Sequence, residues 1–231
     1  MSCIGNDVVD LQHPVNAQKS RDSRYLKKIL APVEIEFVRD AENPDRALWA
    51  LWACKETAYK VISKSSARAS FLPRCWSVQL NQPDSRWAKG EVTLPEGNSV
   101  FVQLSCPESY VHCIGADNLP DLDKIIWGVE SLPEVLSGEN IDPSLFARDC
   151  LSRRLSDIYQ LNFREMAIRR TEKGGELQPP YLYYKNKKAP FDISLSHDGQ
   201  FVAYAFLLCG QDSGGVPAFF NANYREKFGN W

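Results

Sequence analysis

Two carboxylates and a lysine near the start of the chain have the types and spacing to handle a metal ion and a phosphate. Asp7 follows Gly5 in a segment, Cys3 to Val9, whose pattern predicts a strand. Glycine lets a backbone come close to a ligand, so a carboxylate placed just after it can reach one. Glu56 and Lys60 lie four residues apart, which on a helix puts them on one face, about one turn apart.

Mg²⁺ is the cation that suits these carboxylates. It takes oxygen ligands in octahedral geometry, usually one or two carboxylates together with substrate phosphates. Asp7 and Glu56 would supply the two carboxylates, and Lys60 would face the phosphate as a point charge. Each residue alone also has an ordinary interpretation. Glu56 and Lys60 are spaced like a surface ion pair worth about 0.3–0.5 kcal/mol, and Asp7 alone is an acid at the end of a strand.

Ser196 and His197 offer a hydroxyl and an imidazole near the end of the chain. Both groups can bond to a phosphate, and they precede a predicted turn at Asp198-Gly199. A single histidine at such a turn is more often structural. We interpret His13 and His112, which match no motif, as structural.

Three helices are predicted. One spans Asp22 to Asp40 with a break near Ala31-Pro32, because proline lacks a backbone N–H and disfavours helix at the residue before it. The next starts where Asn43 can act as the cap and Pro44 takes the first helical position, and Lys55 interrupts its apolar stripe. The third runs from Ser144 to about Gln160, with Leu145, Phe146, Cys150, Leu151, Leu155, Ile158 and Tyr159 on one side.

Strands are predicted between the second and third helices. Residues 91–94 and 99–104 flank a hairpin turn at 95–98, and residues 110–116 form another strand. The polar stretch from Gln79 to Gly90 is predicted to be a loop.

Two hairpins in the sequence resemble each other. Residues 102–106 and 109–113 align with residues 193–197 and 200–204. At the turn the first copy has Cys106 where the second has His197. Alternating strands often look alike, so this similarity can also arise by chance. If it is a duplication, only the second copy has kept groups that can handle a phosphate.

The bulk composition is that of a globular protein. Hydrophobic residues make up 44% of the 231 residues and charged residues 24%. A net charge of −2 gives no basic field that would point to nucleic acid. Seven scattered cysteines without a CxxC pair predict buried thiols in a reducing compartment. No leader and no apolar run of about 18 residues is present, which predicts a cytoplasmic protein that does not enter a membrane.

Together the three segments resemble the signature of the 4'-phosphopantetheinyl transferase superfamily. Its members carry Gly-x-Asp on a strand and a later helix with the pattern Trp/Phe-x-x-Lys-Glu-x-x-x-Lys. Here these are Gly5 to Asp7 and Trp52 to Lys60. A Ser-His pair grips the 3'-phosphate of coenzyme A in the family, and here it is Ser196 and His197.

The resemblance implies roles for these residues. Asp7 and Glu56 would bind magnesium, Glu56 or a water it orients would take a proton from the acceptor serine, and Lys60 would steady the phosphate. Lys188 stands near the place of a family Gly-Lys-Pro that meets the nucleotide, although the glycine is absent. Two-lobed members often have a second acid two residues after the first. Here that position is Val9, which leaves the third metal ligand open.

The resemblance also implies the fold. We expect α+β architecture with two similar lobes related by a pseudo-twofold axis, each a small, mostly antiparallel sheet packed with a helix. The metal-binding lobe would cover residues 1–117 and the coenzyme A 3'-phosphate lobe residues 144–210, with a connector at 118–143 and a tail at 211–231 of unassigned role. Two-lobed relatives place the Ser-His lobe first. The order here is that of the short holo-acyl-carrier-protein synthases, so we expect a fused pseudo-dimer that acts as a monomer.

The implied reaction is the magnesium-dependent transfer of 4'-phosphopantetheine from coenzyme A to a serine of an acyl or peptidyl carrier protein. Carrier proteins of this kind are acidic. Arg21, Arg24 and Lys28 fall at i, i+3 and i+7 and would form a docking face, or simply a solvated basic face. Two other classes stay open. One is a non-catalytic module that binds coenzyme A or a carrier protein, and the other is an unrelated Mg²⁺-dependent phosphohydrolase.

Overall fold

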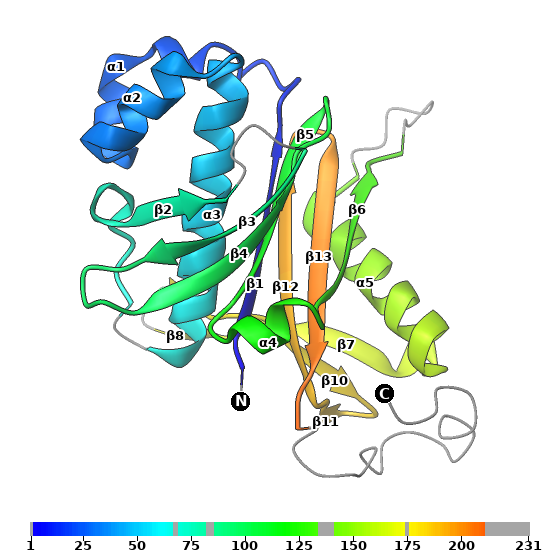
Figure 1. The fold of residues 1–231 in the computed structure, drawn as a ribbon. Coiled ribbons are helices and arrows are strands. Elements are labelled where there is room, and N and C mark those ends of the chain that lie inside the picture. Colours follow the sequence, from blue (N-terminus) through cyan, green and yellow to red (C-terminus); the bar gives the residue numbers. More distant parts are fainter. Residues whose placement is uncertain (1, 67–68, 82–85, 134–140, 174–175, 211–231) are drawn as a thin grey trace.

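The first sheet has five antiparallel strands in the order β1-β5-β4-β3-β2 (Figure 1). The computed structural model describes residues 2–66, 69–81, 86–133, 141–173 and 176–210. The strands of this sheet are β1 (Ile4–Asp10), β2 (Ser77–Leu80), β3 (Trp87–Thr93), β4 (Ser99–Ser105) and β5 (Tyr110–Ala116). Gly97 adopts a positive φ of 87° in the turn between β3 and β4, which is the hairpin predicted from the sequence.

A second sheet has the order β12-β13-β6, a third has the order β11-β10-β7, and β8 pairs with β9. These strands are β6 (Ile126–Ser131), β7 (Met166–Arg169), β8 (Glu172–Lys173), β9 (Glu176–Leu177), β10 (Tyr181–Tyr184), β11 (Lys187–Lys188), β12 (Phe191–Asp198) and β13 (Phe201–Leu208). The molecule is therefore mixed α+β with several small antiparallel sheets, as the sequence predicted at this level.

The predicted helices form, each with a visible physical start. Pro32 separates α1 (Ser23–Ile29) from α2 (Pro32–Asp40). Asn43 caps α3 (Pro44–Ser65) by accepting from the backbone of Arg46 at 3.0 Å. Asp142 caps α5 (Pro143–Tyr159). A short helix, α4 (Leu119–Leu122), was not predicted. None of the helices in the described part of the chain combines the length and apolar character needed to span a bilayer.

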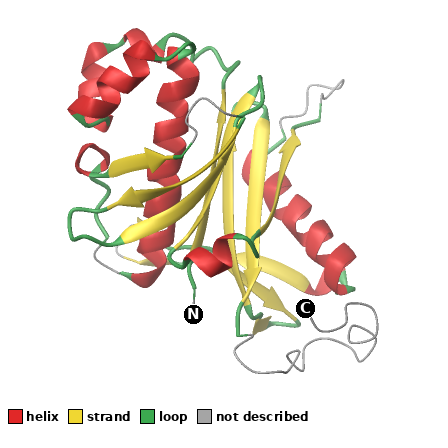
Figure 2. Ribbon diagram, viewed as in Figure 1, coloured by secondary structure: helices red, strands yellow, loops and turns green. Residues whose placement is uncertain are grey.

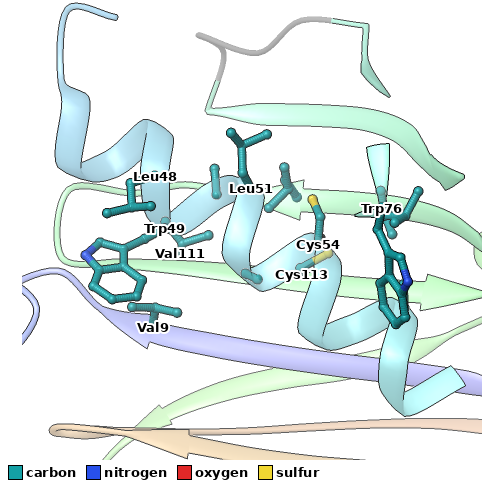
Figure 3. Packing of buried hydrophobic residues seen from close by; sticks show 14 of the residues in the cluster. Val9, Leu48, Trp49, Leu51, Cys54, Trp76, Val111 and Cys113 are labelled. Atoms are coloured by element: carbon teal, nitrogen blue, oxygen red, sulfur yellow. Dashed lines mark hydrogen bonds between the residues drawn. The ribbon is translucent and has the colours of Figure 1, made fainter. Parts of the chain in front are cut away.

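The two longest helices lie on opposite sides of the strands (Figure 2). On one side α3 packs on β1 and β5, with Trp49 near Val9 and Cys54 beside Cys113 (Figure 3). The Cys54 and Cys113 sulfurs are 3.9 Å apart, and all seven cysteines are free thiols. Four of the thiols are buried, as predicted, whereas Cys3 and Cys150 are only partly buried and Cys75 is exposed, where the prediction is wrong. On the other side α5 packs on β12 and β13 through Leu151 and Leu155.

Gly5 serves packing rather than ligand approach. A Cβ at this position would collide with the backbone oxygen of Thr57 in α3. The glycine therefore lets α3 lie directly on β1. Since α3 carries Glu56 and β1 carries Asp7, this close approach also sets the distance between the two carboxylates.

Three sequence predictions need correction. The predicted loop from Gln79 to Gly90 is too long, because β2 continues to Leu80 and β3 begins at Trp87, with Leu80 opposite Gly90; residues 82–85 lie outside the described residues. The segment expected to connect the lobes contains β6, which pairs with β13. Leu145 is exposed, and Ala147 is buried on α5 in its place. The tail at 211–231 lies outside the described residues.

The two similar hairpins form with one register. Ser105 of β4 pairs with His112 of β5, and the aligned residue Ser196 of β12 pairs with Ala203 of β13. A third strand joins each hairpin in the same way, β1 beside β5 and β6 beside β13. The pseudo-twofold axis expected from the sequence stays a prediction.

Lys55, which interrupts the apolar stripe of α3, is fully buried. Its ammonium donates to Glu34 at 2.5 Å, to the Pro73 carbonyl at 2.7 Å and to the Ile29 carbonyl at 3.1 Å. Glu34 in turn accepts from the backbone N–H groups of Ala31 and Val78. Burial lowers the pKa of Lys55, and Glu34 opposes that shift. Lys55 therefore ties α2, α3 and the chain before β2 together and does not face the groove described below.

We expect Lys55→Met to lower the free energy of unfolding by about 3–5 kcal/mol, because it leaves Glu34 buried without its counter-charge. Urea denaturation measures this loss. Lys89→Met is the matched control, since Lys89 forms an exposed pair with Asp123 and should cost no more than about 1 kcal/mol. Equal losses in the two variants would contradict the structural role of Lys55.

Candidate active site

A groove runs between one face of α3 and the strand β12. Two hollows of about 250 and 380 Å³ meet at Glu56, which lines both. From Trp49 to Lys64 the lining face of α3 covers 16 residues and so roughly 23 Å at the helical rise. On the opposite wall Leu195 lines one hollow and His197 the other.

The two halves of the groove differ in chemistry. Lys60, Lys64 and Arg170 line the half toward the end of α3. The side chains of Tyr25, Trp49, Trp52 and His197 line the other half, together with Lys19. The first half is called the basic half and the second the aromatic half.

Asp7 and Lys60 form an ion pair at the meeting point. The Lys60 ammonium donates to Asp7 Oδ1 and to the Asn6 carbonyl, each at 2.8 Å. Asp7 is largely buried, and burial raises the pKa of its carboxyl. Lys60 opposes that shift, whereas the charge of Asp198 adds to it. Asp7 therefore sits among negative charge that a single lysine compensates only in part.

Glu56 shares this crowded environment. Burial and, to a smaller extent, the charge of Asp7 raise its pKa to about 7 against the opposing effect of Lys60. Two buried carboxylates whose charged forms are disfavoured make a site that a proton or a cation would stabilise.

The donor set fits Mg²⁺. Across the described residues, no group of three His, Cys, Asp or Glu side chains has the geometry of a metal site. A divalent ion here would therefore take its protein ligands from the carboxylates of Asp7 and Glu56 and complete its shell with water or substrate oxygens. Magnesium is usually bound in this way.

The structure brings some of the predicted residues together and separates others. Asp7, Glu56, Lys60 and His197 all border the groove. Ser196 does not, because it is buried and its hydroxyl donates to Asn6 Oδ1 at 2.6 Å.

Lys188 also lies away from the groove. It is exposed on β11, its ammonium stands 3.6 Å from the ring centroid of Tyr181, and it lines neither half. Gln178 and Pro180, a few residues earlier in the chain, line the basic half instead.

The predicted docking residues do not all share one helix. Arg21 belongs to a 3₁₀ turn, Lys19–Arg21, and α1 starts only at Ser23 because Asp22 caps it. Arg24 and Lys28 lie on α1 and are exposed. Tyr25 of the same helix lines the aromatic half, so this basic helix borders the groove.

Four residues near the groove were missed by the sequence analysis. Asp198 follows His197 and lines the aromatic half, and Lys64 and Arg170 line the basic half. Arg148 on α5 lies close enough to Arg170 to lower its pKa, after burial, which is the larger cause. Lys64 stands four residues after Lys60 on the same face of α3, a spacing that could have found it. The two arginines come together only in the fold.

Comparison with known proteins supplies one match. Residues 3–114 match the family model described as the 4'-phosphopantetheinyl transferase superfamily. No curated protein matches the chain.

The raised pKa of Glu56 predicts how stability depends on pH without magnesium. Between about pH 4.5 and 7 the folded state holds a proton that the unfolded state has released, so stability falls as pH rises through this window. Glu56→Gln should remove this contribution. We expect the variant to match the wild type near pH 4.5 and to exceed its stability above pH 7 in EDTA.

Urea denaturation at a series of pH values measures the difference between the two proteins. His112, whose pKa burial lowers to about 3, acts with the opposite sign between roughly pH 3 and 6.5. It is present in both proteins and cancels in the difference. A difference that does not change with pH would show that Glu56 does not titrate in this window.

Proposed function

This chain carries a 4'-phosphopantetheinyl transferase superfamily domain over residues 3–114, and from that premise we propose that it transfers 4'-phosphopantetheine from coenzyme A to a serine of an acyl or peptidyl carrier protein. The observation that carries the proposal is the convergence of Asp7, Glu56, Lys60 and His197 on one groove. These residues come from three elements, β1, α3 and β12, far apart in the sequence.

The reaction balances without a further co-reactant. The serine oxygen forms a bond to the phosphorus that carries pantetheine, and the bond from that phosphorus to the bridging oxygen of the diphosphate breaks. Adenosine 3',5'-bisphosphate leaves, and the serine proton passes to Glu56 or to a water that Glu56 orients. Catalysis then rests on positioning and on neutralising phosphate charge, as in other phosphoryl transfers.

Magnesium would neutralise the diphosphate and hold it in line for attack. Asp7 and Glu56 would be its protein ligands. Lys60, which donates to Asp7 at 2.8 Å, would then turn part of its hydrogen bonding toward the phosphate. The raised pKa values of the two acids support this role, because a divalent cation would offset the burial and the neighbouring negative charge that raise them.

Two arginines make the basic half the better place for phosphates of coenzyme A to bind. Arg170 lines it, and Arg148 lies close enough to disfavour the charge of Arg170. The Nε of Arg148 is buried and has no hydrogen-bond partner among the described residues. A phosphate between the two guanidinium groups would relieve both conditions, since arginine binds phosphate through paired N–H donors.

His197 is proposed to reach the 3'-phosphate, as the family resemblance implies. The Ser196 hydroxyl donates to Asn6, so Ser196 would not contact the ligand and would act only by positioning His197. Lys188 could meet only a part of the ligand that extends beyond the groove, because its side chain is exposed outside it.

The acceptor serine would enter through the aromatic half. This half borders α1, whose exposed Arg24 and Lys28 suit an acidic carrier protein. In this arrangement coenzyme A would span both halves, with its 3'-phosphate at His197, and the acceptor serine would reach Glu56 beside it.

The repeated hairpin register and the repeated third strand support a fused pseudo-dimer with one site between its lobes. A monomeric, cytoplasmic enzyme remains part of the proposal.

Asp7→Ala and Glu56→Ala should each lower transfer about 100-fold or more, since each removes a metal ligand and Glu56→Ala also removes the base. The measurement is the intact mass of an apo carrier protein after incubation with enzyme, coenzyme A and Mg²⁺. Glu42→Ala, an exposed acid just before α3, should leave transfer unchanged. Wild-type protein that binds coenzyme A but adds no mass would indicate a binding module instead.

His197→Ala should raise the KM for coenzyme A roughly 10- to 100-fold, the worth of a charge-assisted hydrogen bond to phosphate. The decisive substrate is coenzyme A without its 3'-phosphate, which wild type and variant should use about equally. Arg170→Ala tested on the same two substrates shows which phosphate the basic half holds. An equal defect of His197→Ala on both substrates would contradict its assignment to the 3'-phosphate.

Arg24→Glu should raise the KM for the carrier protein and flatten its salt dependence, with no change in the KM for coenzyme A. Rim charges act mainly on encounter, over a Debye length of about 8 Å at physiological ionic strength. Arg164→Glu, an exposed arginine in the 3₁₀ turn Phe163–Glu165, is the control. The docking proposal fails if the two variants behave alike.

A further inference from the structure

The strands β1 and β12 run side by side (Figure 1), yet no backbone ladder joins them. Side chains of β12 act as the acceptors instead. The backbone N–H groups of Ile4, Asn6 and Asp10 donate to Asp192 at 2.7 Å, to Ser194 Oγ at 2.9 Å and to Asp198 at 2.9 Å. Each partner lies 188 residues further along the chain, so the two strands are parallel and in one fixed register. We call this set of contacts the seam.

Among the described residues of the seam, Asn6 alone also contacts β12 through both the nitrogen and the oxygen of a side chain amide. Its Nδ2 donates to the Ser194 carbonyl at 3.0 Å, and its Oδ1 accepts from the Ser196 hydroxyl at 2.6 Å. Asn6 is fully buried and Ser196 nearly so. The carbonyl of Ser194 can only accept, which fixes the orientation of the amide and obliges Ser196 to donate.

The neighbours of this pair are the residues proposed to act on the substrate. Asp7 follows Asn6 on β1, and His197 follows Ser196 on β12. Both line the aromatic half of the groove. The Asn6 carbonyl also accepts from Lys60 at 2.8 Å. Asn6 is therefore linked to all three: it precedes Asp7, its backbone carbonyl accepts from Lys60, and its side chain accepts from Ser196, which precedes His197.

We propose that Asn6 and Ser196 are positioning residues that hold Asp7 and His197 at a fixed separation across the seam. The expected effect on the transfer rate rests on the proposed function, whereas the expected effect on the contact between β1 and β12 does not. Without the pair, the seam keeps its three backbone N–H contacts to Asp192, Ser194 and Asp198. The distance between β1 and β12 can then increase in the stretch between Ser194 and Asp198, where Asp7 and His197 lie. A displacement of about 1 Å at a phosphoryl-transfer site can lower the rate about 100-fold.

Other polar residues in this position would not serve. Aspartate at position 6 would place a carboxylate oxygen against the Ser194 carbonyl, and leucine would leave both the carbonyl and the Ser196 hydroxyl without partners. Asparagine offers a donor and an acceptor on one planar group, which is what this place in the seam needs.

The test combines Ser196→Ala, Asn6→Ala and the double variant with a matched control. Ser156→Ala removes a hydroxyl that donates to the Leu161 carbonyl at 2.7 Å on α5, away from the groove. All assays are run at a temperature where circular dichroism shows each protein folded. Ser196→Thr, which keeps the hydroxyl, is the rescue variant.

We expect Ser196→Ala to lower kcat/KM for coenzyme A about 10-fold or more. The preference for coenzyme A over its form lacking the 3'-phosphate should fall with it, because His197 is displaced. Ser196→Thr should restore both, and Ser156→Ala should change neither. If Ser196→Ala keeps the wild-type preference and rate while losing stability, the pair only holds the fold together and the proposal is overturned.

The urea midpoints of the four proteins in the cycle test the pair without any substrate. Coupled residues give a double variant less destabilised than the sum of the single variants. Additive losses of stability would show that Asn6 and Ser196 do not act as a pair and would overturn the proposal, even if transfer is demonstrated. Coupling without any transfer by the wild type would leave the seam intact and reject the proposed function. If Asn6→Ala does not fold, Asn6→Ser takes its place in the cycle.

Discussion

The strand β1 is the element on which the rest of the structure depends, because it belongs to both halves of the molecule. Its backbone pairs with β5 along one edge, and the N–H groups facing the other way donate to side chains of β12. A buried strand needs partners for its backbone groups on both sides. β1 obtains them only when the two halves meet, and the carboxylate of Asp7 is carried on the strand that joins them.

Buried charge is handled in two different ways along this strand and helix α3. Lys64 donates to both oxygens of Asp192 at 2.9 Å and to the carbonyls of Ile4 and Ile193, so every charge there has its partner. Lys55 and Glu34 are compensated in the same manner. At the groove, Asp7 and Glu56 share Lys60, and both have raised pKa values. Incomplete compensation in a cleft is the electrostatic mark of a functional site, whereas complete compensation holds elements together.

The sequence predicted what depends on local rules. Pro32, Asn43 and Pro44 determine helix boundaries through the backbone, and the i, i+4 spacing of Glu56 and Lys60 places both on the groove. It failed where a partner distant in the sequence decides. Gly5 makes room for Thr57 rather than for a ligand, and Ser196 is directed into the seam by Asn6. No local pattern could reveal either contact.

Contacts within the fold also determine where Lys188, Arg21 and Arg148 lie relative to the groove. The family resemblance implies a role for Lys188, which lies on the strand β11 after the turn at Lys185 and Asn186 and is not part of the lining of the groove. Arg21 lies outside α1 because the Asp22 carboxylate accepts from the backbone N–H groups of Arg24 and Tyr25 and so caps the helix after Arg21. Arg148 gains its meaning only from Arg170, which α5 and the end of β7 bring near it.

The repeated hairpins also bear on why one groove suffices. If the register that they share reflects a duplication, the counterpart of Asp7, which faces Cys113, is Gly128, which faces Tyr204. The counterpart of His197 is Cys106, which is buried. Gly128 offers no carboxylate, and a Cβ there would meet the Tyr204 hydroxyl at 2.5 Å, so the aromatic ring occupies the space that a ligand would need. The region equivalent to the groove therefore lacks both a carboxylate and an imidazole, and side chain packing fills it. A duplicated chain can thus keep one open site with incompletely compensated charge, while the equivalent region around Gly128 and Cys106 is packed as part of the core.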